Sequence, residues 1–175
     1  AGVLTRVPHT LILAADEFDR FIQENGLDLD EFATLDDATI MGRFARASLG
    51  SDLRQDLARY VERVRFPLAI RSSGLLEDSL YQPFAGLYAT YMLPNNHPDP
   101  SVRLEQLCHA IQLVYASAYL ERPRRYFESI GLNLADEKVA VVIQEVAGQP
   151  HGDLYYPTFS GVAQSYNYYP ISHMK

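Results

Sequence analysis

The chain has 175 residues, 47% of them hydrophobic, which is enough to bury one sizeable core or to form one compact piece of a larger domain. A net charge of −7 argues against a nucleic-acid surface, because binding to phosphate backbones needs a dense basic stripe. The single cysteine, Cys108, excludes an internal disulfide and a multi-cysteine zinc site, and no apolar run approaches the roughly twenty residues of a membrane span. We therefore expect a globular, cytoplasmic protein with neither a nucleic-acid nor a membrane partner.

The first third of the chain predicts one strand that leads into a helix, followed by two more helices. Phe18, Phe21 and Ile22 recur at helical spacing, and Gly26 supplies a stop. Aspartates stand near the starts of the next two helical patterns, as is typical of helix N-termini. The acidic run at 28–31 lacks a framework for a metal and is interpreted as a solvated connector. The elements expected here are a strand over 9–14 and helices over 15–26, 36–48 and 51–65.

The rest of the chain alternates strands with helices. An apolar run that ends at Arg71 predicts a strand through the core, and the unbroken run at 139–143 predicts a strand buried on both faces. Ile111 and Val114 belong to one apolar stripe of a long helix, in which Cys108 is a small buried hydrophobe. The order of elements predicts an α/β (α+β) body. The elements expected are strands over 67–73, 87–93, 137–146 and within 153–169, and helices over 101–120 and 121–131.

The stretch RSSG, residues 71–74, carries the strongest chemical signal. A cation, two hydroxyls and a glycine follow a buried-looking strand, so side chains and backbone N–H groups emerge together. This is the chemistry of an anion site, and a guanidinium fork suits a polyphosphate. The alternative for Arg71 is an internal salt bridge to Glu77 or Asp78.

Four motifs together resemble a known family. They are LAIRSSGLLEDS at 68–79, FAGLYATYML at 84–93, VAVVIQEVAGQ at 139–149 and FSGVAQSYNYYP at 159–170. In this order and at these distances they resemble the nucleotide-binding domain of the phosphoenolpyruvate synthase and pyruvate phosphate dikinase family. The stretch at 6–26 is similar to the family too, so the resemblance spans most of the chain.

The resemblance implies an ATP-grasp-type fold, with a mixed sheet and flanking helices, in which ATP lies between two α+β lobes. It implies ATP and Mg²⁺ as cofactors. The reaction it implies is the transfer of phosphate from ATP to a histidine on a separate mobile domain, which is therefore an expected partner. In the family that phosphohistidine serves pyruvate or, in related enzymes, another acceptor such as a glucan or rifamycin.

The resemblance also implies which residues bind the nucleotide. Arg71 matches the family's phosphate-binding arginine. Ser72, Ser73 and Gly74 match a turn around the phosphates, for which a plain structural turn is the alternative. The acidic pair at 77–78 is expected to orient Arg71 rather than to bind magnesium.

Two further segments complete the expected binding site. The first matches a loop that folds over the nucleotide, with a tight turn into the next strand as the alternative. The second ends the most buried strand and matches the family's segment beside the adenine, where strand-end backbone groups can pair with the adenine edge. The residues concerned are Phe84, Ala85 and Gly86 in the first segment, and Gln144, Glu145 and Val146 in the second.

The chain departs from the family pattern after residue 163. The segment SGVA matches a family strand near the nucleotide, but QSYNYY follows it where phenylalanine, threonine, arginine and asparagine are usual. The family's glycine-lysine loop is expected before Ala1, and its magnesium carboxylates are expected after Lys175. Residues 1–175 are therefore expected to be one partial domain, the N-terminal portion of the nucleotide-binding domain, with neither catalytic nor metal residues and inactive alone.

Two other functions stay open. One is a non-catalytic nucleotide-binding or regulatory module of the same fold, which the altered segment after Ser160 favours. The other is a structural or interaction domain that binds no nucleotide. The tyrosines clustered at 155–169 suggest an exposed face that the chain buries by self-association.

Overall fold

The structure, a computed structural model, describes residues 5–74, 86–133, 137–163 and 165. Four strands form one sheet in the order β1-β4-β2-β3, and β5 and β6 form a separate hairpin. The strands are β1 (Thr10–Leu13), β2 (Leu68–Gly74), β3 (Thr90–Leu93), β4 (Val139–Glu145), β5 (Gln149–His151) and β6 (Leu154–Tyr156). The helices are α1 (Ala15–Glu24), the 3-10 helix η1 (Glu31–Thr34), α2 (Asp37–Arg46), α3 (Ser51–Arg63), α4 (Pro100–Ser117) and α5 (Glu121–Ser129).

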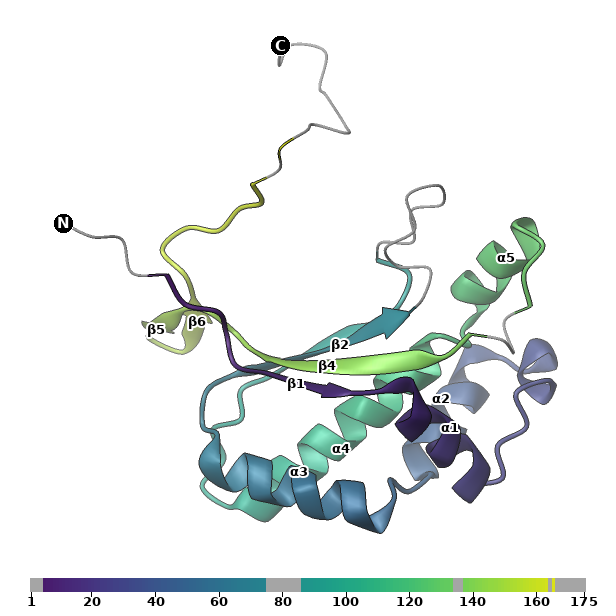
Figure 1. The fold of residues 1–175 in the computed structure, drawn as a ribbon, viewed down its shortest axis with the longest axis horizontal. Coiled ribbons are helices and arrows are strands. Elements are labelled where there is room, and N and C mark those ends of the chain that lie inside the picture. The colour runs from purple at the N-terminus through teal and green to yellow at the C-terminus, as the bar shows by residue number, and fades with distance from the viewer. Residues whose placement is uncertain (1–4, 75–85, 134–136, 164, 166–175) are drawn as a thin grey trace.

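The two faces of the four-stranded sheet differ. Figure 1 shows α1, α3 and α4 beneath one face, which is the face that carries the core. Strand side chains alternate between the faces, so every second residue points away from these helices. We call that second side the open face, because its residues are exposed or only half-buried. It carries Ala69, Arg71, Ser73, Thr90, Met92, Val142 and Gln144.

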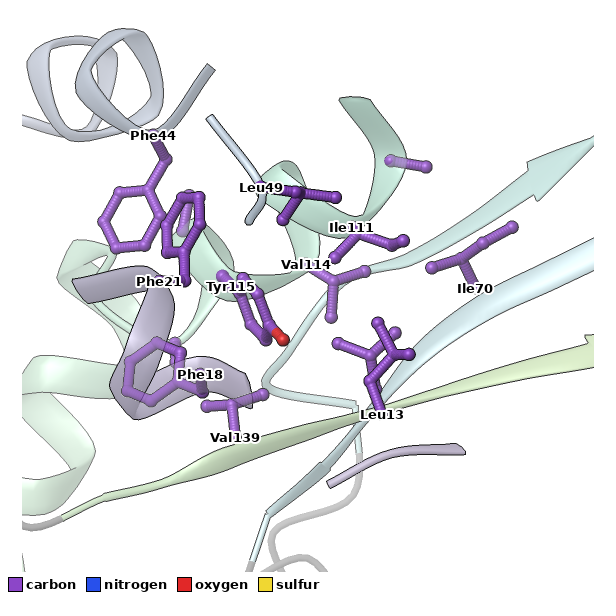
Figure 2. Packing of buried hydrophobic residues seen from close by; sticks show 14 of the residues in the cluster. Leu13, Phe18, Phe21, Phe44, Leu49, Ile70, Ile111, Val114, Tyr115 and Val139 are labelled. Carbon is purple, nitrogen blue, oxygen red and sulfur yellow. The ribbon is translucent and has the colours of Figure 1, made fainter. Parts of the chain in front are cut away.

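The core lies between the sheet and α4. Ile111, Val114 and Tyr115 project from α4 toward Leu13 and Ile70 of the strands (Figure 2), and all five side chains are at most 5% exposed. Aromatic rings extend this core toward α1 and α2. The ring pairs there include Phe18 with Tyr115, whose centroids lie 5.1 Å apart, and Phe21 with Phe44, at 5.8 Å.

Local signals explain where the helices begin and end. The Asp36 carboxylate accepts the Thr39 N–H at 2.7 Å and so caps α2, and Asp99 caps α4 in the same way through Ser101 at 2.8 Å. Helix α1 ends just before Gly26, which adopts the left-handed conformation with a φ of +59°. The expected α+β class and all the expected helices are confirmed. No helix among the described residues combines the length and apolar character that crossing a membrane requires.

Two local expectations were wrong. The run at 139–143 is not buried on both faces, because Val142 is half-exposed on the open face while Val141 and Ile143 are buried on the other. Residues 71–74 continue β2 and do not form a turn. The strand expected within 153–169 is present as the short strand β6, the only strand among the described residues of 153–165. In the sheet, expected to be mixed, all described strand pairs are antiparallel.

Candidate functional site

Arg71 lies on the open face, at the point where two strands part. It pairs with Thr90 in the last register position that joins β2 to β3. Both residues are exposed, and the described residues provide no hydrogen bond or ion pair for the guanidinium. The alternative partners Glu77 and Asp78 lie outside the described residues. Arg71 is thus a cation presented to solvent from a rigid strand.

The other residues of RSSG divide between the two faces. Ser73 is exposed on the same face as Arg71, whereas Ser72 and Gly74 are buried on the helix side. The Ser72 side chain therefore points away from the open face, and only its main chain borders that face. Gly86 follows with a φ of +78°, which is a backbone conformation that favours glycine. Phe84 and Ala85 lie outside the described residues.

Two hollows lie side by side along the open face. One has a volume of about 540 Å³ and gathers residues from three predicted segments, since Arg71, Ser72, Gly86, Gln144, Glu145 and Val146 all line it. The other, of about 580 Å³, lies between the sheet end and the β5–β6 hairpin. They share Met92 and Val146 in their walls. Together they form a groove with Arg71 at one end and largely apolar walls, which also carry Arg65 and Asp153, at the other.

The apolar end of the groove was missed in the sequence analysis. Its walls include Leu93, Pro94, Pro150, Leu154 and Tyr155, which come from β3, the following turn and the hairpin. The alternation of LYATYML could have signalled that Thr90 and Met92 share a face. No sequence pattern could have shown that this face continues onto the hairpin, because that depends on how the chain turns after β4.

The strand end at 144–146 offers fewer main-chain donors than the sequence suggested. The N–H of Glu145 donates to the His9 carbonyl at 2.8 Å, and the N–H of Val146 donates to the Pro67 carbonyl at 2.9 Å. Both donors are therefore occupied within the protein. A purine edge could hydrogen-bond to the main chain of these two residues only through their carbonyl oxygens.

The Glu145 side chain is also occupied. Its carboxylate is 6% exposed, accepts a hydrogen bond from Nη2 of Arg6 at 2.5 Å and accepts the His9 N–H at 3.2 Å. Burial acts to raise the pKa of this carboxyl, but the His9 N–H and the Arg6 guanidinium outweigh it and hold the pKa below its usual value. Glu145 therefore binds the segment before β1 to the end of β4 through hydrogen bonds, and its carboxylate is not free to bind a ligand.

The described residues do not fit the magnesium ion that the resemblance implies. They contain no group of three histidine, cysteine, aspartate or glutamate side chains placed to hold a metal. Among the residues that the structure describes, Glu145 supplies the one carboxylate in the wall of the Arg71 hollow, and Arg6 already neutralises it. The segment at 160–163, also expected near the nucleotide, is exposed and lines neither hollow.

A protein-family model matches nearly the whole chain. The family model described as the AMP/ATP-binding domain of pyruvate phosphate dikinase matches residues 2–174. A search of curated proteins gave no match. Since the family match covers nearly the whole chain, the protein belongs to the pyruvate phosphate dikinase AMP/ATP-binding domain family.

Proposed function

We propose that the groove on the open face binds ATP, with the polyphosphate at Arg71 and the adenosine toward the apolar end. The single observation that carries the proposal is the exposed Arg71 guanidinium in the wall of a hollow shared with the strand end at 144–146. Membership of an AMP/ATP-binding domain family supports the choice of ligand.

At the phosphate end, the chain offers a guanidinium fork and two hydroxyls. Arg71 can donate two parallel N–H bonds to phosphate oxygens, and Thr90 and Ser73 stand on the same face beside it. Because β2 pairs with β4 along its whole length, the cation is fixed to the centre of the sheet. It therefore needs little reordering when a polyphosphate binds.

At the other end, the groove suits a flat apolar ring. Met92 and Val146 can cover the ring faces, and the Leu154 and Tyr155 side of the hairpin closes the hollow. The exocyclic amine of adenine is a donor, so it matches the carbonyl oxygens that remain at 145 and 146. A guanine base would present an acceptor at that position and would meet carbonyl oxygens unfavourably.

We propose further that the chain is the N-terminal portion of an ATP-grasp-type domain and that its parent protein is a phosphotransferase. In that reaction a histidine nitrogen of another domain attacks a phosphoryl group of ATP, and the phosphoryl group leaves the nucleotide for the histidine. The role of this chain is to hold and neutralise the polyphosphate, which is most of what catalysis of phosphoryl transfer requires. The family match supports this proposal at the level of ATP binding.

The alternative is a non-catalytic nucleotide-binding module. The unusual continuation after Ser160 favours it, because that segment replaces the sequence usual in the family. Both functions need the groove to bind ATP, so binding measurements cannot distinguish them. Only a test for phosphoryl transfer to the protein can. Incubation of the parent protein with γ-labelled and β-labelled ATP should give acid-labile, base-stable protein phosphate for the phosphotransferase, and none for the binding module.

Calorimetric titration of the full chain with ATP, GTP and adenosine tests the groove itself. We expect ATP to bind more tightly than adenosine, because only ATP reaches Arg71, and more tightly than GTP, because of the carbonyl oxygens at 145 and 146. ATP binding no tighter than adenosine binding would contradict the placement of the phosphates. Equal affinity for ATP and GTP would contradict the placement of the base.

A further inference from the structure

A buried carboxylate lies directly behind the phosphate end of the groove. Glu137 is 4% exposed and precedes β4, on the helix side of the sheet. A buried carboxylate is costly unless hydrogen bonds stabilise it. The Tyr88 hydroxyl donates such a bond to its Oε1 atom at 3.1 Å, and Tyr88 is itself 7% exposed.

The same carboxylate touches the end of β2. A side-chain carbon added to Gly74 would lie 2.3 Å from Oε1 of Glu137 and 3.0 Å from Cε2 of Tyr88. The first contact is closer than atoms tolerate, so a larger residue at this position would displace the Glu137 carboxylate from its place beside the strand. The glycine of RSSG, expected to serve a phosphate turn, instead lets Glu137 approach the strand.

The contact occurs where the sheet stops holding its strands together. Pairing between β2 and β3 ends at Arg71 and Thr90, so no ladder joins the described residues before Thr90 to those after Arg71. Glu137 contacts both sides of this gap, with Gly74 on one strand and Tyr88 on the approach to the other. Glu137 thereby links the two segments at a position where no backbone pairing between β2 and β3 joins them.

We propose that Glu137 is a positioning residue for nucleotide phosphate, which sets the spacing of Arg71 and Thr90 through Gly74 and Tyr88. This inference rests on the proposed ATP site. Glu137 touches no ligand itself, because it lies on the buried side of the sheet. Its effect is confined to the phosphate end, since the adenosine end of the groove is built from β3, the turn after it and the β5–β6 hairpin.

The structure supplies a matched control. The Tyr119 hydroxyl donates to the main-chain carbonyl of Glu137 at 3.3 Å and is fully buried, but it is not bonded to the carboxylate. Burial raises the pKa of this hydroxyl well above its usual value, and the nearby carboxylates of Glu137 and Asp19 raise it further, so it stays a neutral donor. Tyr119→Phe and Tyr88→Phe each remove one hydroxyl that bonds to Glu137, but only Tyr88→Phe loosens the carboxylate.

The test measures the ratio of the affinities for ATP and adenosine by calorimetry on the full chain, because general destabilisation would weaken both ligands together. We expect Tyr88→Phe to lower the ratio roughly threefold and Glu137→Ala roughly tenfold, with adenosine affinity unchanged, as for a site whose supporting residues are loosened. Gly74→Ala should act in the same direction as Tyr88→Phe. Tyr119→Phe should leave the ratio at its wild-type value.

Two results would overturn the inference. One is a Tyr88→Phe chain that keeps the wild-type ratio, which decides the matter even where Glu137→Ala fails to fold. The other is an equal change of the ratio in Tyr88→Phe and Tyr119→Phe. A failure of the underlying ATP site is distinguishable, because the wild-type chain itself would then bind ATP no more tightly than adenosine.

Discussion

Arg71 and Thr90 form the last register pair between β2 and β3, and both face away from the helices. A charged and a hydroxyl side chain therefore stand next to each other at the edge of a groove, on strands that the core fixes from behind.

Replacement of Arg71 by alanine should weaken ATP binding by about ten- to a hundred-fold, because a charge-assisted contact contributes roughly 1.5 to 3 kcal/mol. Folding should be largely unaffected, since the guanidinium has no partner among the described residues. Arg71→Lys should recover part of the affinity, because lysine keeps the charge but loses the planar fork. Calorimetric titration with ATP and urea unfolding of both variants provide the measurements. An alanine variant that binds ATP like wild type would contradict the role of Arg71 in phosphate binding. If that variant also unfolds more easily, Arg71 has a structural role instead.

The two faces of the sheet should respond differently to the same substitution. Ile143 is fully buried beneath α4, whereas Ile12, its near neighbour on the edge strand, is 61% exposed. Ile143→Ala should lower the free energy of unfolding by about 2 to 5 kcal/mol through lost burial and a cavity. The matched control Ile12→Ala should change it by about 0.5 kcal/mol or less. Urea unfolding followed by circular dichroism measures both, and similar losses in the two variants would show that the assigned faces are wrong.

The Arg6–Glu145 ion pair should make stability depend on pH in the acid range. The pKa of Glu145 in the folded chain is held below its ordinary value of 4.5, so the unfolded chain binds this proton more readily. The carboxylate therefore stabilises the fold above the ordinary pKa, and this contribution is lost as the pH falls through the lowered pKa. Glu145→Gln should flatten the stability profile below pH 4.5, and Arg6→Gln should flatten it in part. Urea midpoints across the acid range measure the slopes, and unchanged slopes in both variants would refute the assignment.

Exposed apolar side chains near the C-terminal end of the described chain predict self-association. Leu154, Phe159 and Val162 are between 67% and 88% exposed, and they belong to the hairpin and the segment that follows it. We expect light scattering to show a molecular mass that rises with protein concentration. Serine at these three positions should reduce the rise, whereas serine at the exposed Val7 should not. A constant monomeric mass for the wild-type chain would exclude this association.

Sequence patterns were sufficient where short-range physics decides the structure. The helix starts follow from caps such as Asp36 and Asp99, and the burial of Cys108 follows from its place on an apolar stripe. The core strand that carries Arg71 was likewise visible, because the residues before Arg71 are apolar.

Patterns were insufficient where distant segments meet. Gly74 is explained by Glu137, and the donors of Glu145 and Val146 are occupied by His9 and Pro67, none of which can be anticipated from neighbouring residues. The unbroken apolar run in β4 was also ambiguous, because it fits a strand covered on both faces as well as one whose second face lines a binding groove.

The strict alternation in β2 ties the chemistry of the groove to the integrity of the core. Ile70 and Ser72 point to the helices, and Arg71 and Ser73 point to the groove. Loss or gain of one residue before Ile70 would invert this order, so that the guanidinium would enter the core and an isoleucine would face the ligand. We therefore expect that relatives of this chain have neither insertions nor deletions within this strand. Relatives can change nucleotide affinity there only by exchanging one side chain for another, or by altering the connections outside the strand.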